Sequence, residues 1–287
     1  MKEVLRGISF LMILTATVCL WSRGAAQIVE QKPSVRFGVC DWTIEKTGDP
    51  AALGLASKLG LEGVQVSLVV KNDTLELAQA SLQKSYLEAA EKHGIGIASF
   101  AIGDLNNIPY KSDPRAEQWI DQSIAICRAM NIKIVLVPFF GKGDLRKDPK
   151  GMETVIERLK RVAPKAENAG VILALESWLS AEDHLKIINA VGSPAVQVYY
   201  DVGNSQEAGY DILKEIRLLG ARICQFHAKD YKDLYGKGTM DFKAVRKAME
   251  DIGYDSWFVL EGTELPLGVE KSIRYDLDYL RTIFTSR

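Results

Sequence analysis

The sequence has no surplus of positive charge and little histidine. Its 36 Lys and Arg residues are matched by 37 Asp and Glu residues, and three histidines occur in 287 residues. Proteins that bind nucleic acid usually carry a basic surplus on the binding face. The charge balance therefore predicts that this chain does not bind nucleic acid.

Common phosphate-binding and serine-hydrolase motifs are also missing. The sequence contains no Walker motif and no G-x-S-x-G elbow. The segment Gly38-Val-Cys-Asp-Trp-Thr, at the end of the first predicted strand, does not supply the G-x-G-x-x-G turn of a dinucleotide-binding sheet. These absences disfavour a nucleotide-binding fold and a serine hydrolase.

Cysteine is too scarce to form a disulfide framework. Of the four cysteines, Cys19 lies in the N-terminal segment, and Cys40, Cys127 and Cys224 each lie in an apolar stretch. An odd number of scattered cysteines does not indicate paired bridges. We expect these three to be buried as small hydrophobic side chains.

The first 26 residues differ in composition from the rest. Lys2 and Arg6 precede an apolar run over residues 8–20, about 13 residues long, whereas a membrane-spanning helix needs roughly 20. Small residues then precede Gln27, which predicts a secretory signal peptide over residues 1–26. We expect an exported protein, periplasmic or extracellular, without stable membrane insertion after cleavage. An uncleaved N-terminal anchor is the alternative.

Residues 27–287 repeat one pattern, in which short apolar runs alternate with longer amphipathic ones. The apolar runs begin on average about 32 residues apart, close to the roughly 31 residues per unit of a (β/α)8 barrel. Such runs, joined by helical crossovers, predict a parallel sheet buried on both faces. Eight repeats favour a closed, single-domain (β/α)8 TIM barrel over an open sheet. The predicted strands begin near Val35, Leu61, Ile95, Lys133, Val171, Val196, Ala221 and Trp257.

The amphipathic runs predict helices with defined ends. Apolar spacing predicts a helix over Thr74–His93 that ends at Gly94. Ser180 opens a capping box and predicts the start of another helix. Pro164 is expected to kink or break the helix predicted over residues 149–170, because proline lacks the N–H that a helix interior needs.

Four successive predicted strands end in an ionisable side chain: Glu176, Asp201, His227 and Glu261. In a barrel the carboxyl ends of the strands meet at one face, where catalytic side chains gather. Three carboxylates converging there would repel one another without a cation. We therefore predict one divalent metal ion, with Lys229 balancing the remaining charge. Oxygen-rich ligation with one imidazole suits Mn²⁺ first, with Co²⁺, Zn²⁺ or Mg²⁺ as alternatives.

With these residues the sequence resembles the xylose-isomerase-like TIM-barrel superfamily of sugar (phosphate) isomerases and epimerases. The resemblance covers essentially all of residues 27–287. The matching motifs are Leu175-Glu176, Tyr200-Asp201-Val202-Gly203-Asn204-Ser205, His227-Ala228-Lys229-Asp230, Gly236-Lys237-Gly238 with Asp241-Phe242, and Gly253-Tyr254 ahead of Leu260-Glu261.

The resemblance implies roles for individual residues. Glu176, Asp201, His227 and Glu261 would hold the metal, and the two glutamates would also act as acid and base on opposite sides of the substrate. The implied enzyme is a sugar isomerase or epimerase of a small ketose or keto-polyol, working by proton transfer through a metal-bound enediolate. Asn204 and Lys229 are expected to bind the substrate. Asn204 departs from the family, since several sugar epimerases have His there.

Two other functions remain open. A lyase or dehydratase would use the same enediolate, as in inosose dehydratases or in β-elimination from a 3-keto-glycoside. A non-catalytic, exported sugar-binding barrel is the other, although the paired Glu176 and Glu261 speak against it. In each case the expected partner is a small sugar or keto-sugar, and homo-oligomer formation is left open.

Aromatic residues and two further histidines complete the predictions. Trp42, Phe139, Phe140 and Trp178 follow strand ends and are candidates for an apolar wall against a sugar. We expect His93 and His184 to lie at a helix end or on the surface rather than to bind metal.

Overall fold

The structure is a computed structural model that describes residues 35–262 and 264–284. The predicted signal peptide over residues 1–26, with Cys19, lies outside the described residues. Among the residues that are described, no helix combines the length and the apolar character needed to cross a membrane.

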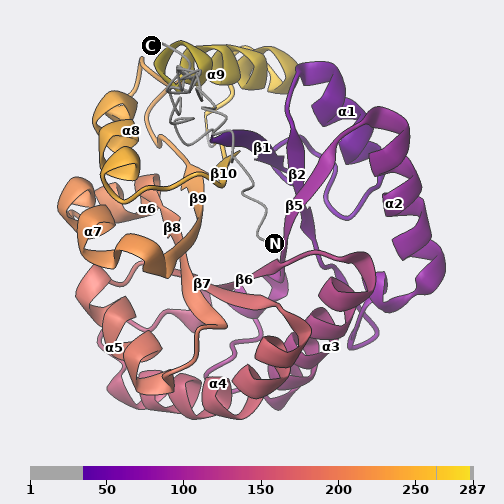
Figure 1. Cartoon of the computed structure of the whole chain (residues 1–287), viewed down its shortest axis with the longest axis vertical. Coiled ribbons are helices and arrows are strands. Elements are labelled where there is room, and N and C mark those ends of the chain that lie inside the picture. The colour runs from indigo at the N-terminus through magenta and orange to yellow at the C-terminus, as the bar shows by residue number, and fades with distance from the viewer. Residues whose placement is uncertain (1–34, 263, 285–287) are drawn as a thin grey trace, which may run out of the picture. The chain divides into compact units, whose positions relative to one another are not determined.

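Eight parallel strands close into one barrel, surrounded by helices (Figure 1). The order around the barrel is β1-β10-β9-β8-β7-β6-β5-β2, and β2 pairs with β1 to close it. The predicted (β/α)8 fold is confirmed, because a barrel strand lies at each of the predicted apolar runs. The strands are β1 (Arg36–Cys40), β2 (Gly63–Ser67), β5 (Gly96–Ala101), β6 (Ile134–Phe139), β7 (Ile172–Ser177), β8 (Val196–Asp201), β9 (Ile223–Ala228) and β10 (Trp257–Leu260).

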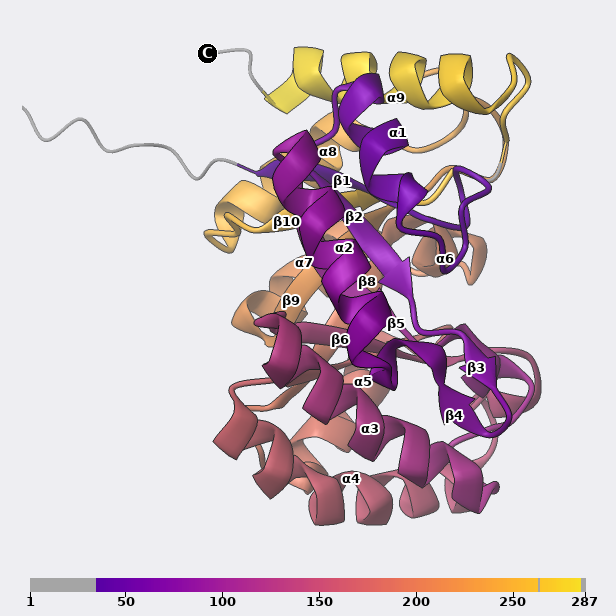
Figure 2. The same ribbon diagram turned by 90° about the vertical axis from the view of Figure 1, so that its right-hand side faces the viewer.

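Helices follow the strands and pack on the outside of the barrel. Figure 2 shows α2 crossing in front of β2 and β5, with α3 and α4 beside it. Ser180 caps α5 as predicted, since its hydroxyl accepts a hydrogen bond from the Asp183 N–H. The helices are α1 (Ala51–Leu59), α2 (Ala80–His93), α3 (Pro114–Met130), α4 (Pro149–Ala169), α5 (Ala181–Val191), α6 (Val202–Glu207), α7 (Ile212–Leu219), α8 (Phe242–Asp251) and α9 (Val269–Phe284).

The prediction of one helix over Thr74–His93 was wrong at its start. Asn72 and Asp73 both have positive φ, the conformation of a two-residue hairpin turn. They join the short antiparallel strands β3 (Val70–Lys71) and β4 (Thr74–Leu75). A 3₁₀ turn, η1 (Glu76–Ala78), follows, so that α2 begins only at Ala80, and it is capped at its end by Gly94 as predicted.

Pro164 does not break its helix. α4 runs without interruption from Pro149 to Ala169, with Pro164 inside it. Val155, Leu159, Ala163 and Ala166 are buried along the same helix. Packing of this apolar face holds α4 together through the position where proline removes one backbone donor.

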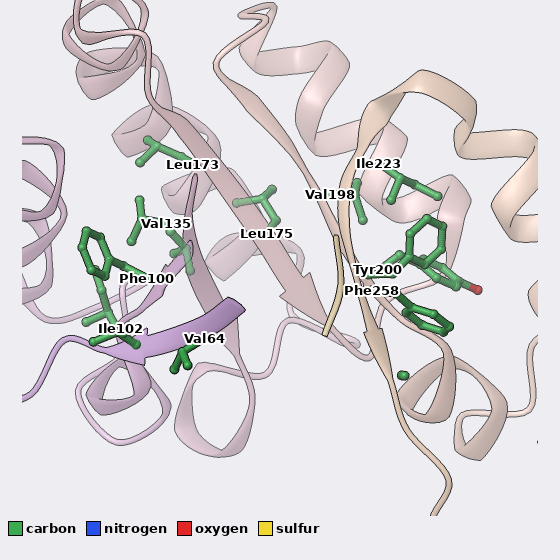
Figure 3. Packing of buried hydrophobic residues seen from close by; sticks show 14 of the residues in the cluster. Val64, Phe100, Ile102, Val135, Leu173, Leu175, Val198, Tyr200, Ile223 and Phe258 are labelled. Carbon is green, nitrogen blue, oxygen red and sulfur yellow. The ribbon is translucent and has the colours of Figure 1, made fainter. Parts of the chain in front are cut away.

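The main hydrophobic core lies between the barrel and the helices, where outward-facing strand residues meet the buried faces of the helices. Figure 3 shows part of this cluster, including Phe100, Leu173 and Val198 from three different strands. Cys40, Cys127 and Cys224 are free and buried, as predicted. Two smaller apolar clusters of strand residues lie apart from this core, one of them around Trp257 and Val259.

Candidate metal centre

The four ionisable residues at the strand ends converge. Glu176 lies in β7, Asp201 ends β8, His227 lies in β9 and Glu261 follows β10 directly. These strands are neighbours in the barrel, and Asp201 and His227 are paired in register. One ligand atom from each of the four residues lies within 4.8 Å of the others.

His227 Nδ1 lies at the middle of this cluster. It is 3.0 Å from Glu176 Oε1, 3.3 Å from Glu261 Oε2 and 3.6 Å from Asp201 Oδ2. Glu176, Asp201 and His227 are buried, and Glu261 is partly exposed. Three carboxylates at this separation, shielded from water, favour a bound cation between them.

The two oxygens of Asp201 have different surroundings. Oδ1 accepts a hydrogen bond of 2.8 Å from the Asn204 N–H and so caps α6. Oδ2 is buried and has no hydrogen-bond partner, although it faces His227. A buried carboxylate oxygen without a hydrogen bond is costly unless a cation lies next to it. The donor set of three carboxylates and one imidazole therefore fits a divalent metal such as Mn²⁺, Co²⁺ or Zn²⁺.

Lys229 lies beside the cluster as the predicted positive neighbour. Its buried Nζ is 2.8 Å from Glu261 Oε2 and 3.4 Å from Asp201 Oδ2. Burial acts to lower the pKa of Lys229, but the carboxylates of Asp201, Glu261 and Glu176 outweigh it and raise that pKa well above its usual value. The ammonium therefore stays charged at every physiological pH.

The carboxylates differ in their affinity for protons. Burial raises the pKa of Glu176 to about 7, despite its contact with His227. For Asp201, burial also acts to raise the pKa, but Lys229 and His227 outweigh it and hold the pKa well below its usual range. Without metal, Glu176 is thus the carboxylate that binds a proton near neutral pH, while Asp201 stays ionised.

Asn204 and Tyr231 form a chain of hydrogen bonds to Glu176. The Asn204 side-chain NH₂ donates to Glu176 Oε1 at 3.2 Å, and the Tyr231 hydroxyl donates to Asn204 Oδ1. Asn204 was predicted from the sequence as a substrate-binding residue, and it does line the pocket. Tyr231 was missed, although its place two residues after Lys229 in the same strand-end loop is a usable signal.

Glu176 and Glu261 of the four-residue cluster lie in the lining of a pocket of about 400 Å³. Trp42, Phe140 and Trp178 line it, as predicted for an aromatic wall, and Trp42 Nε1 donates to Glu261 Oε1 at 3.2 Å. Phe139, the remaining candidate, is instead fully buried in the core. The volume lies within the range of about 300–1,000 Å³ of small-molecule sites.

The two other histidines stand apart from the cluster. His93 is exposed at the end of α2, as expected. The prediction for His184 was wrong, because this side chain is 3% exposed. Its Nε2 lies 3.0 Å from Ser177 Oγ and its Nδ1 lies 3.1 Å from the Ser180 carbonyl oxygen. It therefore ties the start of α5 to the end of β7.

Comparisons with known proteins agree with this arrangement. The family described as xylose isomerase-like TIM barrel matches residues 53–283. A 2-epi-5-epi-valiolone 7-phosphate 2-epimerase of Actinoplanes sp. is 25% identical over 199 residues, covering 68% of this chain and 72% of that protein. L-ribulose-5-phosphate 3-epimerase UlaE of Escherichia coli strain K12 is 22% identical over 227 residues, covering 73% and 80%.

The fold also matches solved structures. A structure of L-ribulose 3-epimerase superposes with a TM-score of 0.73 and 19% identity, covering 88% of this chain and 95% of the other. The family match spans most of the described barrel, including all four strands that carry the metal cluster. The chain belongs to the xylose isomerase-like TIM barrel family.

Proposed function

We propose that this protein is a divalent-metal-dependent sugar epimerase. The observation that carries the proposal is the convergence of Glu176, Asp201, His227 and Glu261 within 4.8 Å, with the two glutamates in the lining of a pocket. The epimerase names of the curated relatives support the same reaction class. Mn²⁺ is the metal we expect, because the donor set is rich in carboxylate oxygen and contains one imidazole.

Glu176 and Glu261 are the proposed acid and base. Both line the pocket, and they come from β7 and β10, which are separated in the barrel by β8 and β9. A substrate held above the cluster therefore has a carboxylate on either side. One glutamate removes the proton next to the carbonyl, and the other returns a proton to the opposite face.

The remaining groups orient the substrate and hold charge. A bound divalent metal would act as a Lewis acid toward the sugar's carbonyl and hydroxyl oxygens. Lys229, already hydrogen-bonded to Glu261 Oε2 at 2.8 Å, places a positive charge next to the oxyanion that proton removal creates. The Asn204 NH₂ donates to Glu176 Oε1 and so helps to fix this carboxylate, which lines the pocket.

Exchange of the carbon-bound proton tests this proposal. The Mn²⁺-loaded protein is incubated in D₂O with L-ribulose, D-fructose and a 3-keto-glucoside, and deuterium next to the carbonyl is measured by mass spectrometry. Each of Glu176→Gln and Glu261→Gln should lower the rate of proton exchange by about 100-fold or more. For two epimers of one sugar, each variant should slow the exchange of one epimer more than that of the other.

Matched controls separate loss of the base from loss of the fold or the metal. Glu182→Gln changes an exposed glutamate in the first turn of α5 and should leave exchange unchanged. Metal content is measured in every variant. Exchange that persists at the wild-type rate in both active-site variants would refute the assignment. Formation of an unsaturated product would favour the lyase alternative, and sugar binding with neither exchange nor product would favour the binding-protein alternative.

We also propose that the protein is exported after removal of residues 1–26. The support is the sequence pattern of a short apolar run between basic and small residues. The mass of the protein recovered from cells tests this, since cleavage after Ala26 gives a chain that begins at Gln27. A mass equal to the full 31.8 kDa chain would favour the uncleaved anchor.

A further inference from the structure

We propose that the substrate of this pocket is an uncharged sugar rather than a sugar phosphate. The inference rests on the proposed function and names the substrate class of the same site. The question is open because the two curated relatives described above carry names of enzymes that act on phosphorylated compounds.

The first argument is the balance of charge at the four-residue cluster. Glu176, Asp201 and Glu261 contribute three negative charges, and Lys229 contributes one positive charge. A divalent cation brings the sum to zero. A phosphate group would add about two negative charges at neutral pH, and burying them in this site would need a further cation.

No further cation is available among the described residues that line the pocket. Lys229 is the one Lys or Arg in that lining. Its Nζ is already held between Glu261 and Asp201. Turning to a phosphate would break both of these ion pairs, which is costly for buried charges.

An arginine beside the aromatic wall is also already ion-paired. The Arg146 guanidinium stacks on the Trp178 ring, 4.6 Å from its centroid. Asp144 holds that guanidinium through three hydrogen bonds, Nη2–Oδ2 at 2.7 Å, Nε–Oδ2 at 3.0 Å and Nε–Oδ1 at 3.2 Å. Its charge is thereby matched by a carboxylate before any ligand arrives.

Helix N-termini are common phosphate sites, and two of those that follow the cluster-bearing strands are filled by carboxylates. The helix after the seventh strand, α8, is capped by Asp241, which accepts from the Lys243 and Ala244 N–H groups. α6, after the sixth strand, is capped by Asp201 in the same way. An anion would have to displace each carboxylate.

The walls of the pocket instead suit an uncharged sugar. Trp42, Phe140, Trp178 and Tyr231 present aromatic surface, and Phe140 and Trp178 meet edge to face at 4.9 Å between centroids. Such rings pack against the C–H faces of sugars. Thr47, Ser67 and Asn106 add uncharged polar groups for hydroxyls.

Matched substrate pairs test the inference. The Mn²⁺-loaded wild-type protein is assayed for proton exchange with D-fructose against D-fructose 6-phosphate, and with L-ribulose against L-ribulose 5-phosphate. The expected result is a kcat/KM at least about tenfold higher for the free member of a pair. Equal or faster exchange of the phosphorylated member would overturn the inference while leaving the epimerase proposal intact.

A charge-adding variant sharpens the test. Thr47→Lys places a cation in the pocket lining and should shift the ratio of kcat/KM toward the phosphorylated member by about tenfold. Thr282→Lys adds the same charge at an exposed position on α9 and should leave the ratio unchanged. A ratio that Thr47→Lys does not move would count against the charge argument.

If neither substrate pair shows proton exchange, the binding affinities of the free and phosphorylated sugars test the inference. That result would refute the epimerase proposal, and calorimetric titration of the same pairs would then test the charge inference alone. Tighter binding of the free sugar supports it. Tighter binding of the phosphate, or binding of neither form, overturns it.

Discussion

Gln65 Oε1 lies 2.7 Å from His227 Nε2, on the opposite side of the imidazole ring from the three carboxylates. An amide oxygen accepts hydrogen bonds, so the His227 Nε2–H donates to Gln65, and Nδ1 is the nitrogen that gives up its proton when it binds a metal. Nδ1 is the atom that faces Glu176, Asp201 and Glu261. Gln65 thus holds the ring in the tautomer that a metal ligand requires.

The first prediction concerns this contact. Gln65→Leu should weaken metal binding by about 10- to 100-fold, as is typical when a residue that orients a ligating His is lost. Gln65→Glu keeps an acceptor oxygen at the same place and should restore most of the affinity. Isothermal titration with Mn²⁺ measures both variants. Equal weakening in the two variants would mean that packing, and not the acceptor, is what matters.

Metal removal should lower thermal stability. A ligand present at 100 times its Kd adds about 2.7 kcal/mol to the free energy of unfolding, and removing it also restores repulsion among the three carboxylates. Calorimetric scans with Mn²⁺ and with a chelator should therefore differ in Tm by several degrees. His227→Ala should show no such difference, and the exposed-residue control Glu182→Gln should show the full one.

His184 should make stability depend on pH. Burial lowers the pKa of His184 to about 4, below the usual 6.5. Between these values the unfolded chain binds a proton that the folded protein does not, so stability is full above pH 6.5 and is lost as the pH falls toward 4. The complete loss amounts to about 3 kcal/mol. His184→Gln should flatten the curve of unfolding free energy against pH in this window, as measured by urea titration, and an unchanged slope would contradict the assignment.

Gly63 and Gly96 offer a matched pair for testing the packing inside the barrel. They are register partners on β2 and β5, and both face Trp257. A Cβ at Gly63 would lie 2.5 Å from the Trp257 ring, whereas one at Gly96 would lie 3.5 Å from it. Arg36 stacks on the same ring at 4.0 Å and restricts its movement.

Gly63→Ala should therefore destabilise the protein by about 1–3 kcal/mol through overpacking, and Gly96→Ala should cost markedly less. Chemical denaturation of both variants measures the difference. Equal costs would show that the indole ring moves aside freely.

The strands were predictable because a parallel barrel buries both faces of each strand, which makes apolar runs stand out between polar segments. The same logic located Glu176, Asp201, His227 and Glu261, since each follows such a run directly. The sequence predicts less about side chains whose positions depend on tertiary contacts. Gln65 contacts His227 on β9 and Tyr231 contacts Asn204 on α6, and no local pattern indicates these pairings.

Two errors have the same kind of origin. The turn at Asn72 and Asp73 takes positive φ at two non-glycine residues, and the hairpin it forms overrides the helical spacing that begins at Leu75. His184 is buried because Ser177, on the preceding strand, supplies a hydrogen-bond partner. The periodicity of a sequence indicates which side chains face inward, but it does not indicate which residues they contact.

The metal ligands all come from β7 to β10, in the second half of the chain, whereas Trp42, Ser67, Asn106 and Phe140 come from loops and strand ends of the first half. The first half of the chain thus supplies only wall residues of the pocket, whereas the second half supplies the whole four-residue cluster together with Trp178, Asn204, Lys229 and Tyr231. We expect that grafting of the early loops alters which sugar enters the pocket, while the later strands keep the proposed acid and base.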